Sequence, residues 1–106
     1  MVSFKDFQAI DLRVGEILSV QGVEGADKLY VLQIDIGGRQ VQTVAGLKQY
    51  YTSDELKGKK VVVVANLDPA KIRGISSEAM LLAAQEGSTV SLLTVDKDVS
   101  VGSKVY

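Results

Sequence analysis

The stretch L-Y-V-L-Q-I-D-I-G-G-R-Q-V-Q-T-V-A, from Leu29 to Ala45, decides the fold class. Apolar and polar residues alternate from Leu29 to Ile36, and this two-residue period is typical of a strand with one buried face. The apolar face comprises Tyr30, Leu32, Ile34 and Ile36. A Gly-Gly pair then gives a strong turn signal, and alternation resumes from Gln40 to Ala45. The stretch therefore predicts a β-hairpin with one apolar face and one polar face.

Short apolar runs separated by turn residues extend this pattern in both directions. The other predicted strands are Leu12–Val20, Lys60–Asn66 and Ala79–Ala84, followed by a hairpin-like pair at Ser88–Val95 and Val99–Val105. Short helices are predicted at Ser3–Ala9 and at Thr52–Lys57, the second with the spacing of a capping box. The predicted loops are Gly22–Lys28 and Leu67–Glu78.

Three strands, a short helix and two more strands form the order of an OB-fold, a five-stranded, partly open Greek-key barrel. Other small barrels share this order. We expect an all-β barrel of the OB class with short helices and with terminal extensions before Leu12 and after Glu86. In its first strand, alternation places one set of side chains on a common face: Leu12, Val14, Leu18 and Val20. Gly15 in that strand indicates a bulge or a close approach.

The composition limits the chemistry that the chain can perform. A length of 106 residues predicts one domain, spanning residues 1–106. The chain has no cysteine and no histidine, which excludes disulfides, cysteine-bound zinc and the Ser-His-Asp and Cys-His nucleophile systems. Its 13 acidic residues are scattered and form no calcium-loop motif. We therefore expect no enzyme activity, no catalytic residue, no metal and no cofactor.

Hydropathy and charge restrict the location and the partners. The longest apolar run, Val61–Ala65, is too short to span a bilayer, and the N-terminus lacks a signal-peptide pattern. These features predict a cytoplasmic protein with no membrane partner. The net charge of −1 argues against strong non-specific nucleic-acid binding, because proteins that neutralise many phosphates are usually basic. A nucleic-acid site would require basic residues concentrated on one face.

An OB-fold binds nucleic acid with the face of its second and third strands and with the loops that join strands 1–2 and 4–5. The loop residues expected to converge there are Lys28, Lys71 and Arg73. The neighbouring strands supply a polar patch of Gln33, Gln40 and Gln42. Taken singly and without the fold, each of these cations is better explained as an ordinary surface residue on a solvated loop.

The segment N-L-D-P-A-K-I-R-G-I-S-S-E-A-M-L-L-A-A, Asn66 to Ala84, resembles the tRNA-binding domain found at the C-terminus of many methionyl-tRNA synthetases. That domain also occurs as a free-standing tRNA-binding protein and in the tyrosyl-synthetase-associated cytokine proteins. Three further blocks resemble the same family: D-L-R-V-G-E-I at Asp11–Ile17, A-D-K-L at Ala26–Leu29 and Y-Y-T-S-D-E-L-K-G-K-K-V-V-V-V-A-N at Tyr50–Asn66. The four blocks follow the family order and cover nearly the whole chain.

The resemblance implies a dimeric, non-catalytic OB-fold that recognises tRNA mainly by shape and backbone. Such a module raises the hold of a synthetase on its substrate, so the implied partners are tRNA, a second copy of the chain and methionyl-tRNA synthetase. Shape recognition suits A-form RNA, whose deep major groove is poorly readable by side chains. The chain starts at Met1 and ends just after V-G-S-K-V-Y, from which we expect a free-standing protein or small subunit.

The resemblance adds residues to the candidate site. Ser77 and Met80 match the S-x-x-M element through which the family contacts tRNA; alternatively, Ser77 caps a turn and Met80 belongs to the core. Asn66 is expected to organise its loop through backbone hydrogen bonds rather than to contact RNA. Asp68 departs from the family, which often has a basic residue there. An acid in the contact loop predicts either weaker binding or an approach of the tRNA from another side.

Aromatic residues are a further source of contacts. Tyr50 and Tyr51 are candidates for stacking on bases, although we expect them to pack under the short helix. Phe4, Phe7 and Tyr106 are predicted to form a barrel end or a subunit interface.

Two alternative functions remain open from the sequence. A branch of the family resembles export-related chaperones that bind unfolded polypeptide through an apolar groove. A purely structural subunit of a larger synthetase assembly is also compatible with the sequence. No H-I-G-H or K-M-S-K-S type motif is present, so we expect that the chain does not activate an amino acid.

Overall fold

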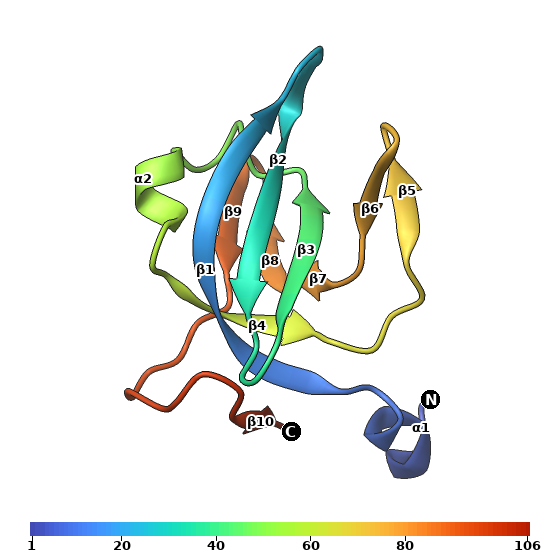
Figure 1. The fold of residues 1–106 in the computed structure, drawn as a ribbon. Helices are drawn as coiled ribbons and strands as arrows, with labels where there is room; N and C mark the ends of the chain where they lie inside the picture. The colour runs from blue at the N-terminus through green and yellow to red at the C-terminus, as the bar shows by residue number, and fades with distance from the viewer.

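The predicted Leu29–Ala45 hairpin forms one side of a curved antiparallel sheet in the computed structural model, which describes residues 1–106 (Figure 1). The strands along the main path of the sheet are β3 (Gln40–Ala45), β2 (Ala26–Asp35), β1 (Leu12–Val23), β4 (Lys60–Val64) and β7 (Met80–Leu81). Helix α2 (Ser53–Leu56) lies between β3 and β4 in the chain. This strand order confirms the predicted OB-fold.

The barrel closes between β3 and the chain that leads into β7. The backbone N–H of Glu78 donates to Gln42 O at 2.8 Å, and the Thr43 hydroxyl donates to Ala79 O at 2.6 Å. Since these contacts replace a full ladder of hydrogen bonds, the barrel is partly open at this seam.

The barrel interior is one cluster of 13 buried hydrophobic residues. Alternate residues of β2 and β4 supply much of it, as the period of two requires: Tyr30, Leu32, Ile34, Val61 and Val63. Leu56 of α2 is fully buried and closes one end. The predicted capping box of α2 is confirmed, because Thr52 N–H donates to Glu55 and Glu55 N–H donates to Thr52 Oγ1. Hydrogen bonding of the Glu55 carboxylate to the backbone N–H and then to the side chain of Thr52 lowers the pKa of Glu55.

The predicted common face of Leu12, Val14, Leu18 and Val20 in β1 is wrong. Ile17 pairs with Ile34 and Ser19 with Gln33, so Leu18 is the extra residue of a β-bulge. The bulge shifts the alternation: Ile17 before it is fully buried, Leu18 is 38% exposed, and Val20 beyond it packs against the core. Leu12 lies on the opposite face of the sheet, in a second cluster with Val62 and Val64.

Both predicted loops are partly strand. β1 and β2 continue to a tight turn at Glu24-Gly25, so Gly22–Lys28 is mostly hairpin. Within Leu67–Glu78, β5 (Ala70–Ile72) pairs with β6 (Ile75–Ser77) to form a separate two-stranded hairpin.

The C-terminal region pairs differently from the prediction. β9 (Thr89–Leu92) pairs with β8 (Ala83–Glu86) through a tight turn in which Gly87 adopts a φ of 57°. β10 (Lys104–Val105) pairs with the start of β1 instead of with the segment before it. The predicted strand Ala79–Ala84 is accordingly divided between β7 and β8. Helix α1 (Phe4–Gln8) begins after the predicted cap, Ser3. No helix has the length and hydropathy that a membrane span requires.

Gly15 lies where three strands approach closely, as the sequence predicted. A Cβ added there would lie 2.7 Å from Ile34 Cγ2 and 2.8 Å from Val63 Cγ2, both on fully buried side chains. We expect Gly15→Ala to lower the free energy of unfolding by about 1–3 kcal/mol, the usual cost of overpacking a core, in urea denaturation.

The matched control is Gly22→Ala in the same strand, where the new Cβ meets only the flexible end of Lys48 at 3.4 Å. Its effect should stay within about 0.5 kcal/mol. Equal effects of the two substitutions would contradict the close approach at Gly15.

Candidate functional site

The hairpin of β5 and β6, residues 70–77 and called the arm below, projects beside the barrel (Figure 1). Its strands pair only with each other. Ile72 pairs with Ile75, and the two turn residues, Arg73 and Gly74, have φ values of 54° and 78°. Positive φ at both positions defines a type I′ turn. Arg73 is the only non-glycine residue with positive φ, and backbone strain of this kind concentrates at functional positions.

The predicted polar patch exists and leads to the arm. Gln40 Nε2 donates to Gln33 Oε1 at 3.3 Å, and Gln33 Nε2 donates to Gln42 Oε1 at 2.8 Å. Gln42 Nε2 then donates to the backbone oxygen of Ser76 in β6 at 2.8 Å. The glutamine chain thus orients the arm on the barrel.

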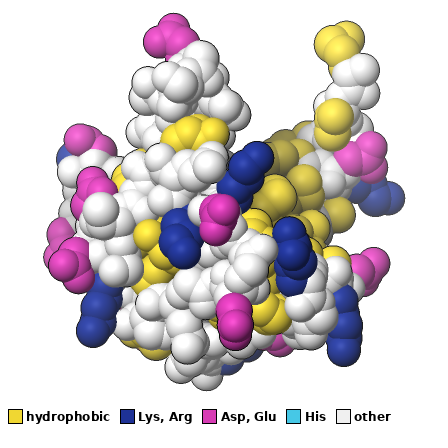
Figure 2. Space-filling view, turned by 90° about the horizontal axis from the view of Figure 1, so that it is seen from above, with side chains coloured by type: hydrophobic (Ala, Val, Ile, Leu, Met, Phe, Trp, Pro, Cys, Tyr) yellow, Lys and Arg dark blue, Asp and Glu magenta, His cyan; other side chains and the backbone are white.

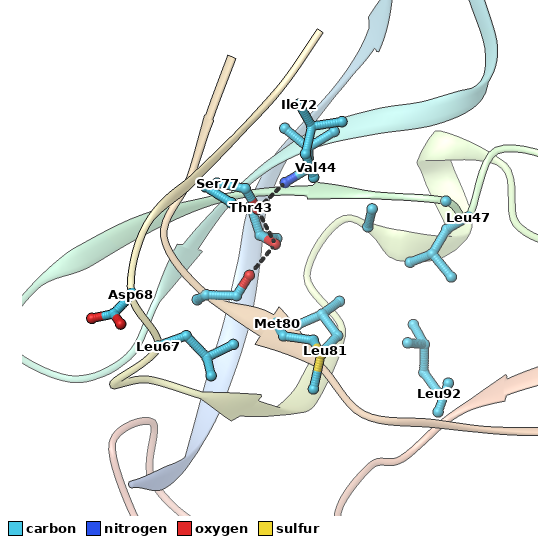
Figure 3. Close-up of a pocket in the computed structure, with 15 residues that line it drawn as sticks. Thr43, Val44, Leu47, Leu67, Asp68, Ile72, Ser77, Met80, Leu81 and Leu92 are labelled. Carbon is cyan, nitrogen blue, oxygen red and sulfur yellow. Dashed lines mark hydrogen bonds between the residues drawn. The ribbon is translucent and has the colours of Figure 1, made fainter. Parts of the chain in front are cut away.

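Ser77 lies in β6 and does not cap a turn. Its hydroxyl attaches the arm to β3. Its buried Oγ accepts a hydrogen bond from Val44 N–H at 3.1 Å and lies 3.4 Å from Thr43 Oγ1 (Figure 3). The hydroxyl is therefore occupied by β3.

Arg73 meets Lys28 at the tip of the arm. Both residues line a recess between the tip and the β1–β2 turn. Lys71 does not join them, because its neighbours Ala70 and Ile72 face inward and strand alternation turns Lys71 to the outer face of the arm. The predicted convergence is thus found for Lys28 and Arg73 and is wrong for Lys71.

Lys48 is a site residue that the sequence analysis missed. Its backbone N–H donates to Lys28 O at 3.2 Å, and its Nζ reaches the strand opposite, near Gly22. Lys48 lines a separate recess beside α2, together with Glu55. We call Lys28, Lys48 and Arg73, which lie in these two recesses, the cation cluster. The two salt bridges of the structure, Arg13–Asp11 and Lys60–Asp98, lie elsewhere, so no carboxylate forms a salt bridge with the cluster, although Asp27 lines the recess of Lys28 and Arg73.

An apolar groove of about 400 Å³ lies between the arm and the barrel. Its side-chain lining includes Val44, Leu47, Leu67, Ile72, Met80 and Leu81 (Figure 3). Seen from above, hydrophobic side chains gather in a hollow that has Lys and Arg side chains beside it (Figure 2). Met80 is 47% exposed here and Ala79 takes the buried position, so the assignment of Met80 to the core is wrong.

Asn66 and Asp68 lie at the opposite end of the arm from Arg73. Asn66 Oδ1 accepts from Asp11 N–H at 2.8 Å and its Nδ2 donates to Ala9 O at 2.7 Å, which is the loop-organising role expected for it. Arg73 lies five positions after Asp68 along extended chain, a distance of roughly 16 Å. The Asp68 carboxylate points away from the groove (Figure 3). Asp68 therefore does not neutralise the cation cluster directly.

The two adjacent tyrosines differ. Tyr51 packs against the core, and its hydroxyl accepts from Leu92 N–H at 3.0 Å. Tyr50 is 39% exposed, so the prediction that it packs under the helix is wrong. The chain contains no group of three or more acidic residues close enough together to hold a metal ion.

Comparison with known families gives one match. Residues 12–104 match the family described as a putative tRNA binding domain. Among curated proteins, the methionine–tRNA ligase of Pyrococcus furiosus is 54% identical over 104 residues and that of Nanoarchaeum equitans is 52% identical over 105 residues. These matches cover 98% and 99% of this chain but only 14% of either ligase. The chain therefore spans a small part of the length of these relatives.

Solved structures share the whole fold. A MetRS related protein from Pyrococcus horikoshii superposes with a TM-score of 0.93 at 30% identity, covering 100% of this chain and 98% of that one. A CsaA chaperone protein from Picrophilus torridus gives a TM-score of 0.91 at 36% identity and covers both chains completely.

The attachment of the arm depends on the Ser77 hydroxyl. We expect Ser77→Ala to lower the free energy of unfolding by about 1–3 kcal/mol, because Val44 N–H loses its buried partner. Amide exchange at Val44 and along β6 should accelerate. Ser76→Ala is the control, since only the backbone of Ser76 bonds to β3. A Ser77→Ala variant as stable as the control would show that the hydroxyl does not fasten the arm.

Proposed function

The chain belongs to the tRNA-binding domain family, and we propose that residues 1–106 act as one non-catalytic module that holds tRNA with the cation cluster. The observation that carries this proposal is that Lys28 and Arg73, from segments far apart in the sequence, line one recess in which neither forms a salt bridge with Asp27. The absence of histidine and cysteine supports a binding role rather than a catalytic one.

The other candidate residues take different parts in this proposal. Ser77 and Asn66 position the arm and its base through backbone contacts. Met80 offers apolar surface in the groove, and Lys71 adds charge on the outer face of the arm. Only the cation cluster is assigned to phosphates.

We propose that the module serves methionyl-tRNA synthetase, as a separate accessory or as part of a larger chain. The similarity to two archaeal methionine–tRNA ligases over nearly the whole chain supports this partner. A weak tRNA contact suffices for such a role, because tethering raises the effective concentration of the substrate near the synthetase.

A small number of cations makes the salt dependence of binding informative. If three cations contact phosphates, log K against log salt should fall with a slope of about −2 to −3. We expect Arg73→Gln to reduce that slope by about 1 and to weaken the binding of a methionine tRNA transcript at low salt, measured by anisotropy.

Two controls sharpen this experiment. Lys57→Gln removes an exposed charge at the end of α2 and should leave the slope unchanged. Arg73→Lys keeps the charge at the tip and should retain the slope. An Arg73→Gln variant that binds like the original protein would remove Arg73 from the site.

A second candidate function is the binding of unfolded polypeptide. The similarity to the CsaA chaperone protein and the apolar groove favour it. Burial of apolar surface is not screened by salt, so a reduced, carboxymethylated protein would bind without the salt slope of tRNA. Binding of this probe, with no tRNA binding at low salt, would favour the chaperone function.

We propose that the chain forms a homodimer through an apolar cluster at its termini. Helix α1 and the C-terminal residues line a recess of about 310 Å³, contributed by Phe4, Phe7, Ile10, Val105 and Tyr106. Phe4 is 74% exposed and Tyr106 is 93% exposed. Large apolar side chains gathered on a surface are typical of an interface. The termini and the tip of the arm lie at opposite ends of the molecule, so this interface would leave both arms free (Figure 1).

Sedimentation velocity at micromolar concentration should give a dimer. Phe4→Glu should shift the population to monomer, because a charge would be buried in the interface. Tyr50→Glu places the same charge at another exposed ring and should leave the dimer intact. A monomeric original protein would refute the homodimer and would leave the tRNA proposal untouched.

A further inference from the structure

The walls of the apolar groove carry cations at one end only. Ile72 lines one wall and is followed by Arg73, while Leu47 lines the facing wall and is followed by Lys48. Consecutive Cα atoms are about 3.8 Å apart, so the backbone of each cation lies at the rim. The Arg73 side chain lines the adjoining recess with Lys28, and that of Lys48 lines the recess beside α2. Lys28 is hydrogen-bonded to Lys48 through the backbone and joins this end. The other end contains Leu67 and Asp68.

The interior of the groove offers apolar contact. The hydroxyls of Thr43 and Ser77 are engaged with Ala79 O and Val44 N–H. The surface that the groove offers to a ligand is therefore mainly aliphatic and includes the thioether of Met80. A volume of about 400 Å³ fits one flat organic group, since small-molecule sites span roughly 300–1,000 Å³.

We infer that the groove receives one unpaired base of the bound tRNA, whose phosphate lies at the cation cluster. This inference rests on the proposed tRNA binding and names the part of the tRNA that the site takes. A paired base cannot enter, because its faces are stacked within the helix, whereas loops and ends present bases that can be splayed out. A nucleotide also matches the polarity of the groove, with its anionic end at the cations and its apolar face against Ile72 and Met80.

Two other occupants match the groove less well. An apolar peptide would use the walls but has no group that requires a cation cluster at one end. A second copy of the chain would use the terminal cluster, which lies at the opposite end of the molecule from the tip of the arm (Figure 1). Charge complementarity therefore favours the nucleotide.

The test separates apolar contact from phosphate contact. Ile72→Ser should weaken binding of the methionine tRNA transcript by about tenfold, the usual effect of removing one base contact from a protein that binds single-stranded nucleic acid. The slope of log K against log salt should not change, because no phosphate contact is lost. Binding of a blunt 16-base-pair RNA duplex should not change. Leu18→Ser is the matched control, because Leu18 is exposed to a similar degree, 38% against 36%, but lies outside the groove.

Fluorescence gives a second readout. When 2-aminopurine replaces each unpaired purine of the transcript in turn, one position should change its emission with the original protein and not with Ile72→Ser. Unchanged tRNA affinity in Ile72→Ser, beside weakened affinity in Arg73→Gln, would overturn this inference and leave the proposed function standing. Absence of tRNA binding by the original protein would overturn both. Loss of carboxymethylated polypeptide binding alone in Ile72→Ser would assign the groove to peptide and overturn the inference.

Discussion

The Thr43 hydroxyl donates a buried 2.6 Å hydrogen bond to Ala79 O, and the geometry of the candidate site depends on this seam. It joins β3 to the chain that has just left the arm and is about to enter β7. Ser77 and Gln42 add their bonds to the same short segment. The same hydrogen bonds therefore close the barrel and fix the distance between the arm and β3. The groove is the space that this seam leaves between them.

The same arrangement explains how an acidic chain can hold an anion. With 12 basic and 13 acidic residues, the average surface offers no attraction to phosphate. The fold instead places Lys28 and Arg73 in one recess and bonds the backbone of Lys48 to Lys28, while Asp68 lies at the far end of the arm. Local field, rather than net charge, then determines where a polyanion can approach. Because the net charge is −1, long-range attraction of a polyanion stays weak.

The sequence predicted the barrel and its order because the decisive strands alternate clearly, above all from Leu29 to Ala45. It could not locate the bulge in β1, since Ile17 and Leu18 are both apolar and only the pairing with β2 decides which one is buried. The arm was missed because its strands have three residues each and its turn is Arg-Gly instead of the usual Asn-Gly. Lys48 enters the site through a hydrogen bond to Lys28, twenty positions earlier, and no local pattern reports such a contact.

The left-handed backbone at Arg73 creates a conflict between the stability of the protein and the side chain that the candidate site uses. Glycine or asparagine would occupy that position with less strain, so a screen for thermostable variants would select a replacement there early. Each such gain would remove the guanidinium from the tip. A laboratory lineage evolved only for heat resistance would therefore tend to lose the phosphate contact proposed for Arg73 while its barrel improved. Selection for both properties would have to find its stabilising substitutions elsewhere, away from the hairpin turn.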